Sequence, residues 1–125
     1  MTPHFNTTTD PKLTCGCGCG FVPTRTFMEK VEELRVRVGF PLPVTSGGRC
    51  PTYNAQVSST GRTGPHTTGM AIDLGVDRGK AYLVLKEALQ MGFTGIGVAQ
   101  RGNSRFLHLD TITIAAGPRP TIWSY

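Results

Sequence analysis

Residues 64 to 75 read Gly64-Pro65-His66-Thr67-Thr68-Gly69-Met70-Ala71-Ile72-Asp73-Leu74-Gly75. The run from Met70 to Val76 has the composition of a mainly buried strand, which would place the Asp73 carboxylate among apolar side chains. A carboxylate buried alone costs several kcal/mol, so Asp73 needs a cationic partner. His66 lies on the preceding loop, and Gly69 permits the sharp turn that folds this loop back over the strand. We therefore expect His66 and Asp73 to share a metal ion.

The sequence after this segment predicts a helix, a β-hairpin and a terminal strand. Asp77 is expected to cap a helix that ends at Gly92, with an apolar stripe formed by Ala81, Val84, Leu85, Ala88 and Leu89. Two strands, 95–100 and 105–111, are expected to flank the hairpin turn Arg101-Gly102-Asn103-Ser104. Side chains alternate along a strand, so one face of the second strand carries Phe106, His108 and Asp110. Residues 121–125 predict a terminal strand.

The sequence before this segment predicts a second helix and a short edge strand. A capping box at Thr26 begins a helix that ends at Gly39, and its apolar positions are Phe27, Val31, Leu34 and Val38. Residues 42–46 predict a strand whose proline suits a sheet edge. Pro51 is expected to open a second short helix. Residues 1–20 are rich in Thr, Pro and Gly, and we expect an irregular N-terminal arm there.

Length and composition limit the class of protein. A chain of 125 residues is expected to form one domain, 1–125. The net charge of +5 comes from scattered basic residues, and only ten residues are aromatic, so we expect no nucleic-acid partner. No apolar run approaches the roughly 18 residues of a membrane span. Residues 1–20 lack the charged start and apolar block of a signal peptide, so we expect no signal peptide. Without an apolar run of spanning length we expect no membrane partner, and we also expect a monomer.

The four cysteines leave three possibilities open. Cys15, Cys17 and Cys19 alternate with glycine, and Cys50 lies far downstream. Free or buried thiols, one disulfide from Cys50 to any of the other three, and a four-cysteine metal site are all compatible with this spacing. The usual Cys-x-x-Cys zinc knuckle is missing.

Histidine and aspartate side chains in these segments form a candidate metal site. Zinc accepts imidazole nitrogens and carboxylate oxygens, and a catalytic zinc has three protein ligands. His66, Asp73 and His108 supply such a set, whereas any one histidine alone would more often be structural. A serine nucleophile is disfavoured because no Gly-x-Ser-x-Gly elbow is present.

Arg49 lies in a stiff turn between two glycines and a Cys-Pro pair. A guanidinium held there suits binding of a carboxylate or a polarised carbonyl through a fork of donors. The alternative is an ordinary surface arginine.

Four motifs, in this order, resemble a known family. They are Ser46-Gly47-Gly48-Arg49-Cys50-Pro51-Thr52-Tyr53-Asn54, His66-x-x-Gly69-x-Ala71-x-Asp73, Gly95-Ile96-Gly97-Val98 and Phe106-Leu107-His108-Leu109-Asp110. Together they are similar to the zinc D-alanyl-D-alanine carboxypeptidases and related phage endolysins, which share a fold with Hedgehog signalling domains and vancomycin-resistance dipeptidases. The resemblance covers roughly residues 5–123. It implies an α+β domain with a small antiparallel sheet flanked by helices, and zinc-dependent cleavage of peptide bonds in bacterial cell-wall stem peptides.

The resemblance also implies roles for individual residues. It implies that one zinc ion is bound by His66, Asp73 and His108. Arg49 matches the family's substrate-orienting or oxyanion-stabilising arginine, and Ser46 of the same turn is assigned to substrate binding with it. The family's usual general-base positions hold Arg105 and Phe106 in this chain. Asp110 is therefore the predicted proton shuttle, with a contact that only holds His108 as the alternative.

Two other functions remain open from the sequence. The first is a zinc-containing module that binds cell wall or a protein partner without cutting it. The second is a small structural protein that binds zinc through its cysteines. For the peptidase, we expect a phage protein, in the virion or in the host cytoplasm before lysis, that acts on the periplasmic or extracellular cell wall.

Overall fold

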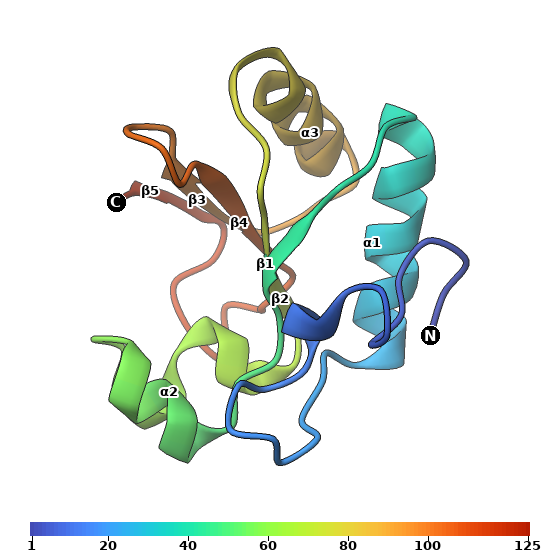
Figure 1. Cartoon of the computed structure of the whole chain (residues 1–125). Coiled ribbons are helices and arrows are strands. Elements are labelled where there is room, and N and C mark those ends of the chain that lie inside the picture. The colour runs from blue at the N-terminus through green and yellow to red at the C-terminus, as the bar shows by residue number, and fades with distance from the viewer.

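Five strands form one sheet in the computed structural model, which describes residues 1–125. The helices are α1 (Arg25–Val38), α2 (Pro51–Val57) and α3 (Arg78–Gln90), and the strands are β1 (Val44–Ser46), β2 (Ala71–Leu74), β3 (Gly95–Ala99), β4 (Phe106–Asp110) and β5 (Thr121–Ser124). The strands lie in the order β1-β2-β4-β3-β5. Figure 1 shows α1 and α3 beside each other along the sheet, with α2 away from them. The α+β class is confirmed.

The sheet is mixed, whereas an antiparallel sheet was expected. Four strands pair antiparallel, from β1 through β2 and β4 to β3. The last strand, β5, pairs parallel to β3. The chain between β4 and β5 crosses the end of the sheet before pairing, and strand alternation alone cannot predict such a crossing. This parallel pairing brings residues near the C-terminus beside β3.

The two faces of the sheet have different chemistry. One face is apolar and packs against α1 and α3, through Ile72, Leu74, Ile96, Leu107 and Leu109. Phe27 and Phe93 meet edge to face within this core, with ring centroids 6.2 Å apart. The opposite face of β2 and β4 carries Asp73 and His108, because side chains alternate along each strand. The packing of the apolar face against α1 and α3 therefore fixes the strands that carry Asp73 and His108 on the opposite face.

The helix ends agree with those predicted from the sequence, except for two differences in capping. The N-cap of α1 is Thr24, not Thr26, and its hydroxyl accepts a hydrogen bond from the Phe27 backbone at 3.3 Å. Gly39 ends the helix in the left-handed conformation, with φ of 77°. Asp77 precedes α3 as predicted, but its side chain makes no capping hydrogen bond. No helix is both long and apolar enough to cross a membrane.

The N-terminal arm is irregular but belongs to the core. It contains one short 3₁₀ helix, Pro11–Leu13, and the Phe5 and Leu13 side chains are fully buried. The backbone N–H of Gly48 donates to the carbonyl of Leu13 at 2.9 Å. The arm is thereby attached to the turn that carries Arg49.

Candidate metal centre

The central strands place two of the predicted ligands directly opposite each other. In the antiparallel pair of β2 and β4, Asp73 is the register partner of His108. The same row continues on both sides, with Ser46 of β1 opposite Asp73 and Gly97 of β3 opposite His108. Residues opposite each other in a sheet point to the same face, so the backbone itself brings this carboxylate to this imidazole.

His66 reaches the same point from a 3₁₀ helix, Pro65–Thr68, that lies before β2. Gly69 ends this helix with φ of 75°, and the chain turns there into the strand as predicted. The Nδ1 atom of His66 lies 2.7 Å from the carbonyl oxygen of Gly47. Because a carbonyl can only accept, Nδ1 carries the proton and Nε2 faces Asp73 Oδ1 at 3.2 Å.

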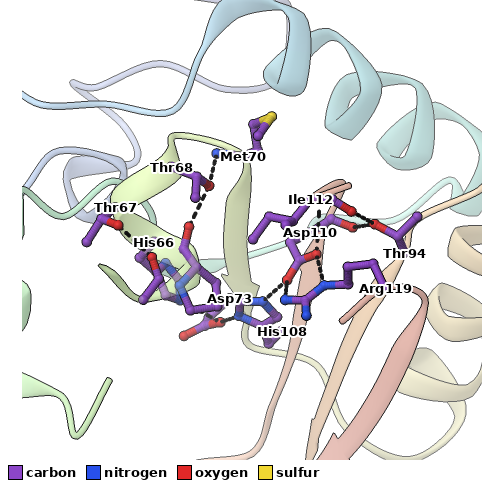
Figure 2. Close-up of polar contacts among 12 residues, drawn as sticks. His66, Thr67, Thr68, Met70, Asp73, Thr94, His108, Asp110, Ile112 and Arg119 are labelled. Carbon is purple, nitrogen blue, oxygen red and sulfur yellow. Dashed lines mark hydrogen bonds and ion pairs between the residues drawn. The ribbon is translucent and has the colours of Figure 1, made fainter. Parts of the chain in front are cut away.

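His108 lies between two carboxylates. Its Nδ1 atom is 3.0 Å from Asp73 Oδ1, and its Nε2 atom is 2.8 Å from Asp110 Oδ2. Figure 2 shows Asp73 on one side of the His108 ring and Asp110 on the other. The ring is 1% exposed, so neither contact competes with solvent.

These three side chains fit a zinc ion. One ligand atom from each of His66, Asp73 and His108 lies within 4.8 Å of the others. Two imidazole nitrogens and one carboxylate oxygen form a common donor set for catalytic zinc. The second nitrogen of each histidine is bound, to the Gly47 carbonyl and to Asp110, and such contacts fix ring orientation in metal sites. The predicted ligands are therefore brought together in a suitable arrangement.

Asp110 lies where it cannot serve a water molecule in the cavity. Its side chain has no exposed surface. Arg119 Nε lies 2.9 Å from Asp110 Oδ1 and Arg119 Nη2 lies 2.8 Å from Oδ2, so the carboxylate is bound by a guanidinium fork. Asp110 Oδ1 also accepts from the backbone N–H of Ile112 at 3.3 Å, and Oδ2 contacts the nitrogen of His108 that faces away from Asp73. This geometry favours the alternative, a group that holds His108, over a proton shuttle at Asp110.

Sequence reasoning missed Arg119 and the contact made by Trp123. Arg119 was counted only among the scattered charges, although the buried Asp110 requires a cation. The Trp123 ring packs on His108 with centroids 5.0 Å apart, and the Arg119 guanidinium lies 5.3 Å from the Trp123 ring centroid. A β-carbon on Gly97 would lie 2.8 Å from Trp123 Nε1, so a side chain at that position would displace the indole.

Arg49 is held in place by two neutral side chains. Its Nε and Nη2 atoms donate to Ser46 Oγ at 3.2 Å and 3.0 Å, and Nη1 donates to Asn54 Oδ1 at 3.0 Å. Nη2 also lies 4.0 Å from Asp73 Oδ2. Arg49 is thus not a free surface arginine, and Ser46 acts on it directly. Asn54, which is 1% exposed, was not predicted as part of the site.

An open cavity of about 520 Å³ lies over these groups. Its lining includes His66, Asp73 and His108 together with Arg49, Arg119, Trp123 and Tyr125. Asp73 has the only acidic side chain among the lining residues. The lining does not include Arg105, whose Nε donates to the carbonyl of Gly102 in the hairpin turn at 2.9 Å. The cavity therefore combines a metal-binding set with fixed positive charge.

Comparison with known families agrees with this geometry. A family model described as Peptidase M15 matches residues 6–110, which include every predicted ligand. The chain belongs to the peptidase M15 family. Members of this family are zinc-dependent peptidases with D-Ala-D-Ala carboxypeptidase-like chemistry, and the α+β fold fits the family. Searches of curated proteins and of solved structures gave no match.

The charges at the M15 site shift three pKa values. Burial raises the pKa of the Asp73 and Asp110 carboxyls, but the hydrogen bonds they accept outweigh burial and lower each pKa to about 2. The donors are His108 and His66 for Asp73, and His108 and Arg119 for Asp110. Burial lowers the pKa of His108, but its contacts with Asp110 and Asp73 raise the pKa overall. In the metal-free peptidase both carboxyls are therefore ionised and His108 readily holds a proton.

We predict a specific pH dependence for the metal-free M15 peptidase. A carboxyl whose pKa is lower in the folded than in the unfolded state stabilises the fold above the unfolded value, about 3.9. This stabilisation is lost as pH falls toward the folded pKa of about 2. Urea unfolding of the EDTA-treated protein should show a falling free energy of unfolding from about pH 5 to about pH 2.

The variant Asp110→Asn tests the source of this pH dependence. The variant should be less stable than the wild type at about pH 5, and this deficit should shrink toward about pH 2, where wild-type Asp110 also becomes neutral. A deficit that stays constant over this range would contradict the prediction.

Proposed function

We propose that this chain hydrolyses peptide bonds in the stem peptides of bacterial peptidoglycan, with one zinc ion held by His66, Asp73 and His108. The observation that carries the proposal is the position of this ligand set in an open cavity beside the fixed Arg49 guanidinium. The M15 family supplies the reaction class, a zinc-dependent peptidase. The charge of the cavity supports the substrate class.

The chain's own residues prepare the site for the metal. His66 presents Nε2 and His108 presents Nδ1 toward Asp73, while Gly47 and Asp110 hold the opposite nitrogens. His66, Asp73 and His108 would hold the zinc ion, which when bound would lower the pKa of a water molecule to roughly 7 and polarise the scissile carbonyl. The Trp123 ring covers the side of His108 and limits its rotation.

Arg49 favours a substrate that carries carboxylates. Its guanidinium lines the cavity, whereas the guanidinium of Arg119 is bound to Asp110, and the whole chain has a net charge of +5. Peptidoglycan stem peptides carry carboxylates along the chain and at the terminal D-alanine, and guanidinium groups bind carboxylates through paired hydrogen bonds. Either a carboxypeptidase or an endopeptidase reaction fits this charge. Action on a cell wall by a phage lysis or virion protein is the biological setting that we propose.

Arg49 orients the peptide and stabilises the negative charge that develops on the carbonyl oxygen. The variant Arg49→Lys keeps the charge but loses the fork that Ser46 and Asn54 hold. We expect kcat/KM to fall by about 10²–10³, the loss seen when one oxyanion donor is removed. Steady-state kinetics on a synthetic stem peptide would measure it.

The matched control is Arg37→Lys on α1. Arg37 forms only an exposed ion pair with Glu33, so kcat/KM should be unchanged. Equal activity of Arg49→Lys and the wild type would show that Arg49 does not contact the reacting group.

Digestion of purified peptidoglycan tests the proposed function. The wild type should release fragments with new amino and carboxyl termini, identified by mass spectrometry, and EDTA or Asp73→Asn should abolish the release. The mass of the fragments also identifies the bond that is cut. A fully active metal-free protein would overturn the proposal.

One observation favours a second function, a zinc-containing module that binds cell wall without cutting it. Asp73 has the only acidic side chain in the cavity lining, and Asp110 is bound to Arg119 and His108. A site without a free general base could bind a stem peptide without hydrolysing it. Co-sedimentation with peptidoglycan and no new termini would select this function.

A further inference from the structure

Four thiols meet at a point that the His-Asp-His site does not use. The Sγ atoms of Cys15, Cys17, Cys19 and Cys50 all lie within 4.8 Å of one another. Cys15 and Cys17 are 3.4 Å apart, Cys15 and Cys50 are 3.8 Å apart, and Cys17 and Cys50 are 3.7 Å apart, measured between Sγ atoms. None of the four forms a disulfide. Of the possibilities open from the sequence, the structure shows free thiols gathered in one cluster.

The spacing of these sulfurs matches a metal site. In a tetrahedral four-thiolate zinc site each Zn–S bond is about 2.3 Å, which separates the sulfurs by about 3.8 Å. A disulfide would require about 2.05 Å between two sulfurs. The three distances above, from 3.4 Å to 3.8 Å, are close to the edges of the zinc tetrahedron. Three side chains from one short segment and one from a distant turn therefore converge as zinc ligands do.

The backbone is shaped to bring the first three cysteines together. Gly18 and Gly20 have φ of 83° and 89°, a conformation that favours glycine. The chain also closes on itself, because the Cys15 N–H donates to the Phe21 carbonyl at 2.8 Å and the Gly18 N–H donates to the Cys15 carbonyl at 3.1 Å. A curled Cys-Gly-Cys-Gly-Cys segment thereby replaces the usual Cys-x-x-Cys knuckle.

Two backbone amides point at the sulfurs. The N–H of Cys50 donates to Cys15 Sγ at 3.4 Å, and the N–H of Tyr53 donates to Cys50 Sγ at 3.4 Å. Donors of this kind stabilise the negative thiolates that bind a metal, and contacts around the ligands orient them. Cys50 also occupies the N-cap of α2, so the helix start fixes the fourth ligand.

We propose that Cys15, Cys17, Cys19 and Cys50 bind a second zinc ion, in a closed structural site. Four cysteine ligands fill the tetrahedral coordination of zinc and leave no open position for a substrate or a water molecule. The evidence for this site does not rest on the proposed hydrolase function. It adds one metal ion to the single zinc expected from the sequence.

The position of the cluster gives the second ion a role. Cys50 follows Arg49 directly, and Figure 1 shows the blue N-terminal segment beside the start of α2. The same turn contains Gly47, whose carbonyl accepts the proton of His66 Nδ1, and Gly48, which donates to Leu13 in the arm. An ion bound by the arm and the turn together holds Arg49 and the Gly47 carbonyl in place at the catalytic site.

Metal stoichiometry of purified variants tests the proposal. We expect two zinc ions per wild-type chain by elemental analysis, one after His66→Ala with His108→Ala, and one after Cys17→Ser with Cys19→Ser. Cobalt replaces zinc and reports its ligands: the histidine variant should keep the intense thiolate-to-cobalt charge-transfer band, and the cysteine variant should lose it. The histidine variant leaves all four cysteines intact, so the test does not depend on the cysteine variant folding.

Three results would overturn the proposal. One is a wild type with a single zinc ion that disappears in the histidine variant. Another is a loss of two titratable thiols in the denatured, unreduced protein, which would indicate a disulfide. The last is iron in place of zinc together with a visible iron–sulfur spectrum. If hydrolysis of peptidoglycan failed while two zinc ions were found, the proposed function would fall and the cysteine site would stand.

Discussion

The variant His66→Ala is expected to lose the zinc ion of the His-Asp-His site and with it peptide-bond cleavage. His66 supplies one of only three protein ligands, and the variant leaves only Asp73 and His108 of this ligand set. A metal ion contributes several kcal/mol of transition-state stabilisation, and each 1.36 kcal/mol is tenfold in rate. We therefore expect kcat/KM to fall by at least about a thousandfold. Stem-peptide hydrolysis and bound zinc would be measured on the same sample.

The control for this prediction is His4→Ala. His4 lies on the arm and pairs with Glu32 of α1, away from the cavity. It should retain both activity and metal. Full activity of His66→Ala, or loss of activity with zinc still bound in full at this site, would contradict the assignment of His66 as a ligand.

The variant Asp110→Ala is expected to destabilise the fold by about 3–5 kcal/mol, the cost of breaking a buried ion pair from one side. The Asp110 side chain has no exposed surface, and the Arg119 side chain is only 8% exposed, so the guanidinium would be left buried without its partner. His108 Nε2 would lose its hydrogen bond as well. Urea unfolding of the EDTA-treated protein would measure the change in free energy of unfolding.

Two further variants make this prediction specific. Adding Arg119→Met to Asp110→Ala removes both charges and should recover part of the lost stability. Glu33→Ala breaks the exposed pair with Arg37 and should cost less than about 1 kcal/mol. Equal losses of free energy of unfolding for Asp110→Ala and Glu33→Ala would show that the buried pair stabilises the fold no more than the exposed one.

The parts of the site that could be predicted are those that local rules determine. Gly69 and the apolar run after it predicted the turn into β2 and the burial of Asp73, and both are found. Alternation along β4 placed His108 on one face, and the register with β2 brings it to Asp73. Period and turn chemistry are encoded in neighbouring residues, so a sequence alone reveals them.

The role of Asp110 could not be predicted in the same way. Asp110 shares a face with His108, as alternation requires, but two residues along a strand are displaced by nearly 7 Å. That displacement puts the Asp110 carboxylate behind the imidazole and beside Gly95. A β-carbon added to Gly95 would lie 2.2 Å from the carboxylate oxygens of Asp110. Sharing a face is therefore not the same as sharing a cavity.

The long-range partners depend on the crossing that makes β5 parallel to β3. Arg119 meets Asp110 and Trp123 meets His108 only because the chain crosses the end of the sheet after β4. No spacing or period in the sequence encodes that crossing. The cysteine cluster also depends on long-range packing. The sequence shows that three cysteines alternate with glycine, but their contact with Cys50 depends on how the arm packs against the turn before α2.

The row that joins Ser46, Asp73, His108 and Gly97 across four strands has a consequence for folding. A shift of one residue in the pairing of β2 with β4 would turn Asp73 and His108 to opposite faces. A metal ion that needs both ligands can bind only the correct pairing, and its binding free energy is then added to that pairing alone. A zinc ion held by Asp73 and His108 would thus favour the native alignment of the two strands over alignments shifted by one residue.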